Sequence, residues 1–426
     1  MKKEERNSHK LVYISTSDQS AMKFAIILFL TSPALSIYAQ QVDVSKIRQH
    51  IKTLASDSMQ GRPTGKEGER MAAAYIQSEF KKLKLKTRGD ENTFQQAFPF
   101  KSGAHGEGEG GTGHNLAAYL DNKAATTIII GAHFDHLGTG DQGGSLDANP
   151  QGKIHNGADD NASGVAGVLE LARLLTINKT KEKNNFLFLC FSGEELGLYG
   201  SKYFTEHATL DLSAVNFMIN MDMIGRLDEQ TKTVAVNGIG TSPVWEPLLK
   251  SLESDQLKIK MDSAGIGPSD HTSFYLKNIP VLHFFTGSHS DYHKPSDDWG
   301  KINYPGEEAV LNLILKVITA LDAQPRLTFL TTKSKPMTSR SSFKVTLGIM
   351  PSYTSEGEGL KVDGMTEGRP AQKAGIQTGD TILQMGDIVI KDIQNYMEAL
   401  GKFEKGQTVP VKVKRGDEVL ILSVTF

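Results

Sequence analysis

The sequence of 426 residues contains one cysteine and no long run of basic residues. One cysteine excludes an intramolecular disulfide bond. Cys190 lies inside an apolar run, and we interpret it as a small core residue rather than as a nucleophile. Lys and Arg (47) nearly balance Asp and Glu (49), which gives a net charge of −2. Because nucleic-acid binding usually requires a basic surface, we expect no nucleic-acid partner.

The apolar run near the N-terminus is too short to span a membrane. This run, Phe24–Leu30, follows Met22 and Lys23 and precedes a small residue, Ala39, which is the pattern of a secretory signal peptide. We therefore expect residues 1–41 to be an N-terminal extension and signal peptide. The mature protein is then periplasmic or secreted, without a stable membrane span. A buried or membrane-bound first helix is the alternative.

Short apolar runs alternate with helical patterns between residues 43 and 325. Three runs rich in aromatic or β-branched residues are expected to be buried strands: Thr126–Ile130, Asn185–Phe191 and Val215–Met221. Amphipathic spacing predicts helices at Lys66–Leu85, Ala162–Thr176 and Pro305–Ala323. This alternation predicts an α/β fold, a three-layer sandwich around a mostly parallel mixed sheet.

A Gly-rich stretch covers residues 101–115. Gly106, Gly108 and Gly111 match the spacing GxGxxG of dinucleotide-binding loops. No strand leads directly into the match and no helix follows it, so the required context is missing. We interpret residues 101–115 as a loop.

Polar side chains follow the apolar runs at the points where the predicted strands end. The central run continues into FSGEELGLY, which contains the adjacent carboxylates Glu194 and Glu195. The other candidates are His133 and Asp135 after the first strand, Asp160 at the next helix start, Asp222 after the third strand and His293 after the last. Because open α/β sheets place ligand sites at the carboxyl ends of their strands, we expect these side chains to lie together.

Imidazole and carboxylate groups without thiolates suit zinc. Five such ligands are too many for one open tetrahedral ion, but they suit two ions that share a bridging carboxylate. His133 and Asp135 are two residues apart and point the same way on an extended strand, so Asp135 can orient the imidazole. Of Glu194 and Glu195, one is expected to bind a metal ion and the other to move protons.

Six motifs in this region resemble those of the di-zinc aminopeptidases of metallopeptidase family 28. In chain order they are GAHFDHLG, NGADDNASG, FSGEELGLYGS, NMDMIG, SDHTSF and DYHKPSD. The resemblance implies two Zn²⁺ ions as cofactors. It implies that His133 and Asp222 bind one ion. Glu195 and His293 would bind the other, and Asp160 would bridge the two.

The same resemblance implies catalytic roles for three residues. Glu194 would be the general base, Asp135 would orient His133, and Tyr292 would help to hold the oxyanion. The implied protein is an exported zinc-dependent aminopeptidase, which uses a metal-bound hydroxide to hydrolyse N-terminal residues from peptides with a free N-terminus. The alternatives are a carboxypeptidase or other exopeptidase on the same core, a glutaminyl cyclase-like acyltransferase with one zinc ion, and an inert binding protein.

Ser, Thr and Lys dominate residues 331–342. We therefore expect residues 326–342 to be a linker between a zinc peptidase domain, residues 43–325, and a C-terminal domain, residues 343–426. In the latter, Thr346–Met350 and Gly375–Leu383 resemble the carboxylate-binding loop and the GLxxGDxIL segment of bacterial PDZ domains. The resemblance implies a β-rich PDZ-like domain that binds a peptide C-terminus. A domain that only packs on the peptidase domain is the alternative.

Overall fold

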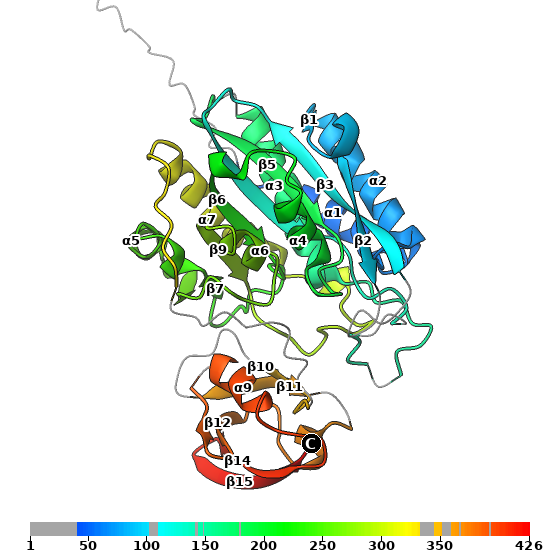
Figure 1. The fold of residues 1–426 in the computed structure, drawn as a ribbon, viewed down its shortest axis with the longest axis vertical. Coiled ribbons are helices and arrows are strands. Elements are labelled where there is room, and N and C mark those ends of the chain that lie inside the picture. Colours follow the sequence, from blue (N-terminus) through cyan, green and yellow to red (C-terminus); the bar gives the residue numbers. More distant parts are fainter. Residues whose placement is uncertain are drawn as a thin grey trace, which may run out of the picture. The chain divides into compact units, whose positions relative to one another are not determined.

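The computed structural model describes residues 41–101, 110–140, 144–147, 149–178, 180–332, 345–351, 359–365, 368–391 and 393–426 (Figure 1). The expected signal peptide lies outside these residues, apart from its last residue, and so do residues 333–342 of the expected linker. None of the helices in the described ranges combines the length and apolar character needed to cross a membrane.

The strands before residue 326 form one mixed sheet in the order β1-β3-β5-β4-β6-β9-β7-β8, with β2 paired to β3. Their bounds are β1 (Lys86–Thr87), β2 (Gln95–Lys101), β3 (Gly110–Leu120), β4 (Thr126–His133), β5 (Asn184–Phe191), β6 (Val215–Met221), β7 (Thr233–Asn237), β8 (Lys258–Asp262) and β9 (Val281–Phe285). β4 pairs in parallel with β5 and β6, and β6 pairs in parallel with β9. β3 and β7 flank this parallel centre with antiparallel pairing.

Helices cover both faces of the sheet (Figure 1). They are α1 (Val44–Leu54), α2 (Glu67–Lys82), α3 (Gly164–Ile177), α4 (Tyr199–Glu206), α5 (Trp245–Leu252), α6 (His271–Tyr275) and α7 (Tyr304–Asp322). Successive strand residues point to opposite faces. Ile128 thus joins a core with α1, α2, α3, α5 and α7, whereas Ile129 joins Phe204 of α4 and Phe274 of α6. The sandwich has the three predicted layers.

The interpretation of residues 101–115 as a loop is wrong for its described C-terminal part. Residues 110–115 belong to β3, and residues 102–109 lie outside the described residues. β2 aligns Phe98 with Gly113 and Phe100 with Gly111. A Cβ atom at Gly113 would lie 2.5 Å from the Phe98 ring, and one at Gly111 would lie 2.7 Å from the Phe100 ring. The glycines are therefore strand positions over which aromatic rings of the neighbouring strand pack.

The parallel strands deliver their carboxyl ends to one edge of the sheet. β4 ends at His133, β5 ends at Phe191 just before the Glu pair, and β6 ends at Met221 just before Asp222. All residues of β5 and β6 are buried, as expected for central strands covered on both faces. Because these strands are packed on both faces, the positions of the candidate site residues at their carboxyl ends are fixed.

The first residues of the expected linker pack on the N-terminal α/β domain. The Leu327 amide donates to Oδ1 of Asn216 at 2.8 Å, and the Leu330 amide donates to the carbonyl of Thr241 at 2.8 Å. Residues 327–332 therefore continue the compact part of this domain beyond helix α7.

The C-terminal residues form a second, antiparallel sheet in the order β10-β11-β12-β14-β15, with β13 paired to β12. Its elements are β10 (Ile349–Pro351), β11 (Leu360–Met365), α8 (Pro370–Lys373), β12 (Thr381–Met385), β13 (Ile388–Val389), α9 (Ile393–Leu400), β14 (Thr408–Arg415) and β15 (Glu418–Thr425). Leu347, Val362, Ile382 and Val411 contribute to a separate apolar core. This unit is β-rich, as predicted.

Candidate metal centre

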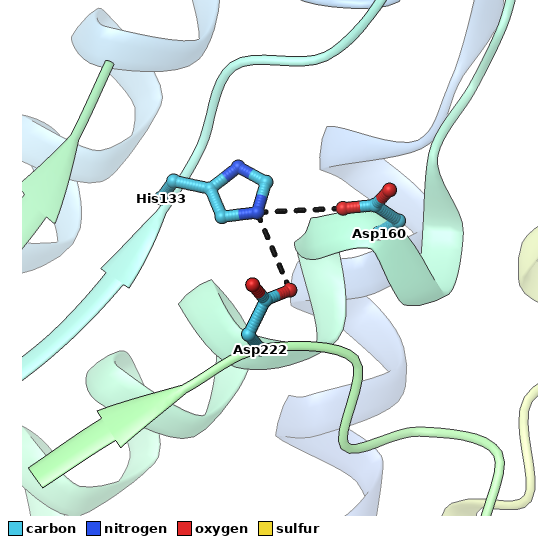
Figure 2. Close-up of side chains that lie close together, drawn as sticks. All are labelled: His133, Asp160 and Asp222. Atoms are coloured by element: carbon cyan, nitrogen blue, oxygen red, sulfur yellow. Dashed lines mark hydrogen bonds and ion pairs between the residues drawn. The ribbon is translucent and has the colours of Figure 1, made fainter. Parts of the chain in front are cut away.

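Three of the predicted ligands meet at the ends of β4 and β6 (Figure 2). Nε2 of His133 lies 3.3 Å from Oδ1 of Asp160 and 3.3 Å from Oδ1 of Asp222. His133 is the last residue of β4, Asp222 follows β6, and Asp160 lies in the helical turn that leads into α3. His133 and Asp160 are almost fully buried. The first cluster is thus His133, Asp160 and Asp222.

The other two predicted ligands, His293 and Glu195, lie near the second carboxylate oxygen of Asp160. Nε2 of His293 lies 3.2 Å from Oδ2 of Asp160 and 3.0 Å from Oε2 of Glu195. Glu195 follows β5, whereas His293 comes from the segment after β9. The second cluster is thus Asp160, Glu195 and His293, and the two oxygens of Asp160 face different clusters.

The donor spacing fits zinc. Tetrahedral zinc with bonds of 2.0–2.1 Å to nitrogen and oxygen separates its donor atoms by about 3.3 Å. The four separations between imidazole nitrogens and carboxylate oxygens in the two clusters lie between 3.0 and 3.3 Å. Two ions that share a bridging carboxylate require one oxygen on each side, which is how Asp160 is placed. The chemistry and spacing of these residues therefore fit zinc.

The adjacent residues Asp159, Asp160 and Asn161 form different side-chain contacts just before α3. Oδ1 of Asn161 accepts hydrogen bonds from the amides of Gly164 at 2.9 Å and Met223 at 3.2 Å. Oδ1 of Asp159 accepts one from the amide of Gly225 at 2.7 Å. Asn161 therefore joins the first residue of α3 to the loop after β6, and Asp159 holds the same loop. Neither contact uses the carboxylate of Asp160, which faces His133 and His293.

Asp135 connects the first cluster to the Glu pair. Its Oδ1 lies 3.6 Å from Nδ1 of His133 and accepts a hydrogen bond from the Glu194 amide at 3.2 Å. Thr64 donates to its Oδ2 at 3.0 Å. The fully buried Asp135 is thus placed to orient the imidazole and also holds the backbone of Glu194.

Asp222 is held by a chain of two hydrogen bonds. Ser269 donates to Oδ2 of Asp222 at 2.7 Å, and Nδ2 of Asn220 donates to Oγ of Ser269 at 2.8 Å. Oδ2 is therefore occupied by a protein donor, whereas Oδ1 faces His133. This arrangement presents Asp222 as a ligand through one oxygen.

Two contacts at the centre were not predicted from the sequence. Nδ1 of His136 lies 2.7 Å from Oε1 of Glu195, so it orients that carboxylate while Oε2 faces His293. Arg62, whose Nε donates to the carbonyl of Phe134 at 2.7 Å, is fully buried. The HxDH spacing was the available signal for His136, because it places a second imidazole after the same strand.

A cavity of about 270 Å³ opens on the two clusters. Its lining includes Glu194 and Tyr292 together with the five predicted ligands. The ring of Tyr292 stacks on that of His293 with centroids 3.9 Å apart. The structure therefore brings the predicted ligands, Glu194 and Tyr292 to one cavity, with Asp135 buried behind it.

The charges at the centre depend strongly on one another. Burial alone lowers the pKa of His133, but Asp222 and Glu194 outweigh this effect and raise it well above its usual range. Burial raises the pKa of Glu195, but His293 outweighs it and holds this pKa at about 2. Burial and the nearby carboxylates Asp222 and Glu195 raise the pKa of Glu194 well above its usual range, although His133 opposes them. The centre is a concentration of carboxylates that favours cations.

Comparison with known proteins agrees with this geometry. Residues 115–318 match the family model of peptidase family M28, and residues 345–426 match that of the PDZ domain. The chain carries an M28 peptidase domain followed by a PDZ domain.

The relatives are aminopeptidases and related proteins that match over part of their length. Aminopeptidase YwaD of Bacillus subtilis is 35% identical over 156 residues, 33% of this chain and 32% of that protein. Leupeptin-inactivating enzyme 1 of Streptomyces exfoliatus is 26% identical over 268 residues, 61% of this chain and 53% of that protein. The chain thus spans between a third and about half of these two curated relatives.

Solved structures show the same fold. A Zn-dependent exopeptidase from Parabacteroides distasonis has a TM-score of 0.53 and 17% identity over 66% of this chain and 98% of its own. A glutaminyl cyclase from Porphyromonas gingivalis has a TM-score of 0.53 and 18% identity over 66% of this chain and 99% of its own. At these identities the likeness concerns the fold alone.

Proposed function

We propose that this peptidase is an exported aminopeptidase that removes N-terminal residues from peptides with two zinc ions. His133 and Asp222 would hold one ion, Glu195 and His293 would hold the other, and Asp160 would be shared. When bound, such ions act as Lewis acids and make water a nucleophile near neutral pH. The donor separations of 3.0–3.3 Å in both clusters support this assignment.

Glu194 moves the protons in this proposal. Its side chain lines the cavity beside both clusters, and its backbone is held by Asp135. A carboxylate in this place takes a proton from the attacking water and passes it to the leaving amine. Tyr292 also lines the cavity and is proposed to help hold the oxyanion.

The observation that favours an aminopeptidase over a carboxypeptidase is the charge of the cavity wall. Among the described peptidase-domain residues that line it, there is no Lys or Arg, whereas four are carboxylates: Asp160, Glu194, Glu195 and Asp222. A C-terminal carboxylate would find no Lys or Arg side chain there, while an α-ammonium group would find Glu194, the one of the four carboxylates that is not assigned to zinc. Met223, Phe285 and Tyr292 supply an apolar wall for the side chain of the N-terminal residue.

The test uses the purified full chain, metal analysis and a panel of aminoacyl-anilides and carboxypeptidase substrates. We expect two zinc ions per chain, loss of hydrolysis with a chelator, and recovery with zinc. Glu194→Gln is expected to lower kcat by about 10²- to 10⁴-fold with both zinc ions retained. Glu206→Gln, at the exposed end of α4, is the matched control. Wild-type turnover by Glu194→Gln, or chelator-resistant hydrolysis, would contradict the proposal.

A glutaminyl cyclase-like transfer is the second candidate, because a glutaminyl cyclase shares the fold. The complete set of five donors argues against it, since one zinc ion would leave part of the set without a metal. Incubation with an N-terminal glutaminyl peptide distinguishes the two. Hydrolysis releases glutamine, whereas cyclisation forms pyroglutamate and leaves the peptide chain intact.

We further propose export to the periplasm or the medium, and binding of a peptide C-terminus by the PDZ domain. Export predicts a mature N-terminus after Ala39, which N-terminal sequencing of fractionated cells tests. PDZ binding predicts that a peptide with a free C-terminus binds and that its amidated form does not. Full-length protein in the cytoplasm, or equal binding of both peptides, would contradict the respective proposal.

A further inference from the structure

Arg62 is a fully buried cation whose partners are all neutral. Its Nε donates to the carbonyl of Phe134 at 2.7 Å, and its Nη1 donates to those of Leu54 and Asn156 at 2.7 Å each. Its Nη2 donates to the carbonyl of Gly157 at 2.8 Å. Within the described residues, no carboxylate forms an ion pair or a hydrogen bond with Arg62. A buried guanidinium without a charged partner is costly and calls for an explanation.

Three of the four carbonyls that Arg62 contacts lie on the segments that carry His133 and Asp160, and the fourth belongs to helix α1. Phe134 stands between His133 and Asp135, and Gly157 lies three residues before Asp160. Leu54 ends α1. One planar guanidinium therefore connects the end of β4 to the loop that leads into α3, which are the two segments whose spacing sets the contact between His133 and Asp160.

The backbone around Arg62 is interlocked with the same two segments. The carbonyl of Arg62 accepts a hydrogen bond from the His136 amide at 3.2 Å, and that of Gly61 accepts one from the Gly138 amide at 3.0 Å. A Cβ atom at Gly61 would lie 2.5 Å from the His155 carbonyl oxygen and 2.7 Å from that of Gly138. Only glycine allows this close approach at a φ of +66°.

The charge of Arg62 opposes that of the centre. Burial lowers the pKa of Arg62 to about 10, and the nearby carboxylates Asp160 and Asp135 oppose this effect. The side chain therefore remains a cation at neutral pH. Its positive charge offsets the negative charge of the buried carboxylates Asp160 and Asp135, while its hydrogen bonds go to backbone carbonyls.

We propose that Arg62 is a positioning residue that fixes the spacing between the two ligand-bearing segments and thereby sets zinc affinity. The inference rests on the proposed two-zinc function. Lysine keeps the charge but lacks the planar fork, so it cannot hold four carbonyls at once. Removal of residues that orient metal ligands costs about 10- to 100-fold in metal affinity.

The test measures zinc affinity of apoprotein variants by titration against a competing chelator. Arg62→Lys and Arg62→Gln are expected to bind zinc at least about 10-fold more weakly than wild type. Arg62→Ala is expected to regain affinity when guanidinium ion is added at concentrations that do not unfold wild type. The matched control is Arg173→Ala, which removes a cation from the fully buried Glu170, at 2.6 Å on α3. We expect it to lower Tm without a change in zinc affinity.

Each outcome decides the inference. Zinc affinity within twofold of wild type in Arg62→Lys and Arg62→Gln, or no effect of guanidinium on Arg62→Ala, would overturn it. If none of the variants folds even with zinc and guanidinium present, Arg62 belongs to the core of the fold and the inference is overturned as well. A wild-type protein that binds zinc but cleaves no aminoacyl substrate would refute the proposed function alone.

Discussion

Buried charges are arranged in opposite ways in the peptidase domain and in the PDZ domain. In the PDZ domain, Asp380 is 1% exposed and forms an ion pair with Arg415. Nε and Nη2 of Arg415 donate to the two carboxylate oxygens of Asp380 at 2.8 Å each. The amide of Gln377 completes the set at 2.9 Å. In the peptidase domain, by contrast, Asp160 lies within 3.9 Å of three histidines, His133, His136 and His293, and Glu194 and Asp222 line the same cavity.

The difference separates a charge that stabilises a fold from charges kept for a ligand. A carboxylate held by a bidentate Arg is already neutralised, so it gains little from a further cation. Carboxylates that crowd around imidazoles repel one another and gain from a divalent ion. Removal of a charged partner should therefore destabilise the PDZ domain, whereas removal of a carboxylate from the centre should mainly cost metal binding.

The largest expected effect is that of Asp160→Asn. The amide removes one acceptor oxygen and the negative charge that both clusters share, so we expect both zinc ions to bind at least about 100-fold more weakly. Asp222→Asn touches one cluster and should leave about one zinc ion per chain bound. Metal analysis after dialysis and calorimetric titration give both numbers. Loss of a single ion in both variants would show that Asp160 is not shared.

Arg415→Ala is expected to act on stability instead. It leaves the buried Asp380 without its charged partner, so we expect the PDZ domain to unfold at a lower temperature. Thermal unfolding of the full chain measures this change, and anilide turnover should stay at the wild-type rate. Lys412→Ala, an exposed cation on the same strand, is the control. Equal Tm values for both variants would show that the pair contributes nothing to stability.

The smallest expected effect is a difference in the pH ranges over which the domains lose stability. Burial lowers the pKa of His50 in α1 to about 4. The unfolded chain then binds more protons between about pH 6.5 and 4, so the peptidase domain loses stability as the pH falls through this range. Burial raises the pKa of Asp380, but Arg415 outweighs it and holds this pKa below 3.8. Its contribution to the PDZ domain is therefore complete above pH 3.8 and is lost only below it.

Tryptophan fluorescence separates the two domains, because both tryptophans, Trp245 and Trp299, lie in the peptidase domain. Circular dichroism follows both domains together. We expect the fluorescence transition in mild denaturant to occur at higher pH than the second phase of the circular dichroism transition. His50→Phe should make the peptidase domain less sensitive to pH between 6.5 and 4. An unchanged pH dependence in this variant would assign the loss of stability to other groups.

The sequence predicted those features that depend on strand order and on local spacing. His133, Glu195 and Asp222 follow apolar runs, and the carboxyl ends of parallel strands necessarily meet at one edge. The contact of Arg62 was not predictable, because it depends on the tertiary path of a loop whose residues are polar and irregular. β3 was missed because glycine is a poor strand former, and its aromatic partners in β2 lie ten or more residues away in sequence.

The side chains of the consecutive residues Asp159, Asp160 and Asn161 have different contacts. Asp159 holds the loop after β6, Asp160 faces His133 and His293, and Asn161 joins that loop to the first residue of α3. A change in the length of this segment is therefore not tolerated. Deleting or inserting a single residue here would shift all three side chains by one position and disrupt all of these contacts together. Length variation in relatives should therefore collect in the surrounding loops, and this short stretch should keep its length even where its residue types differ.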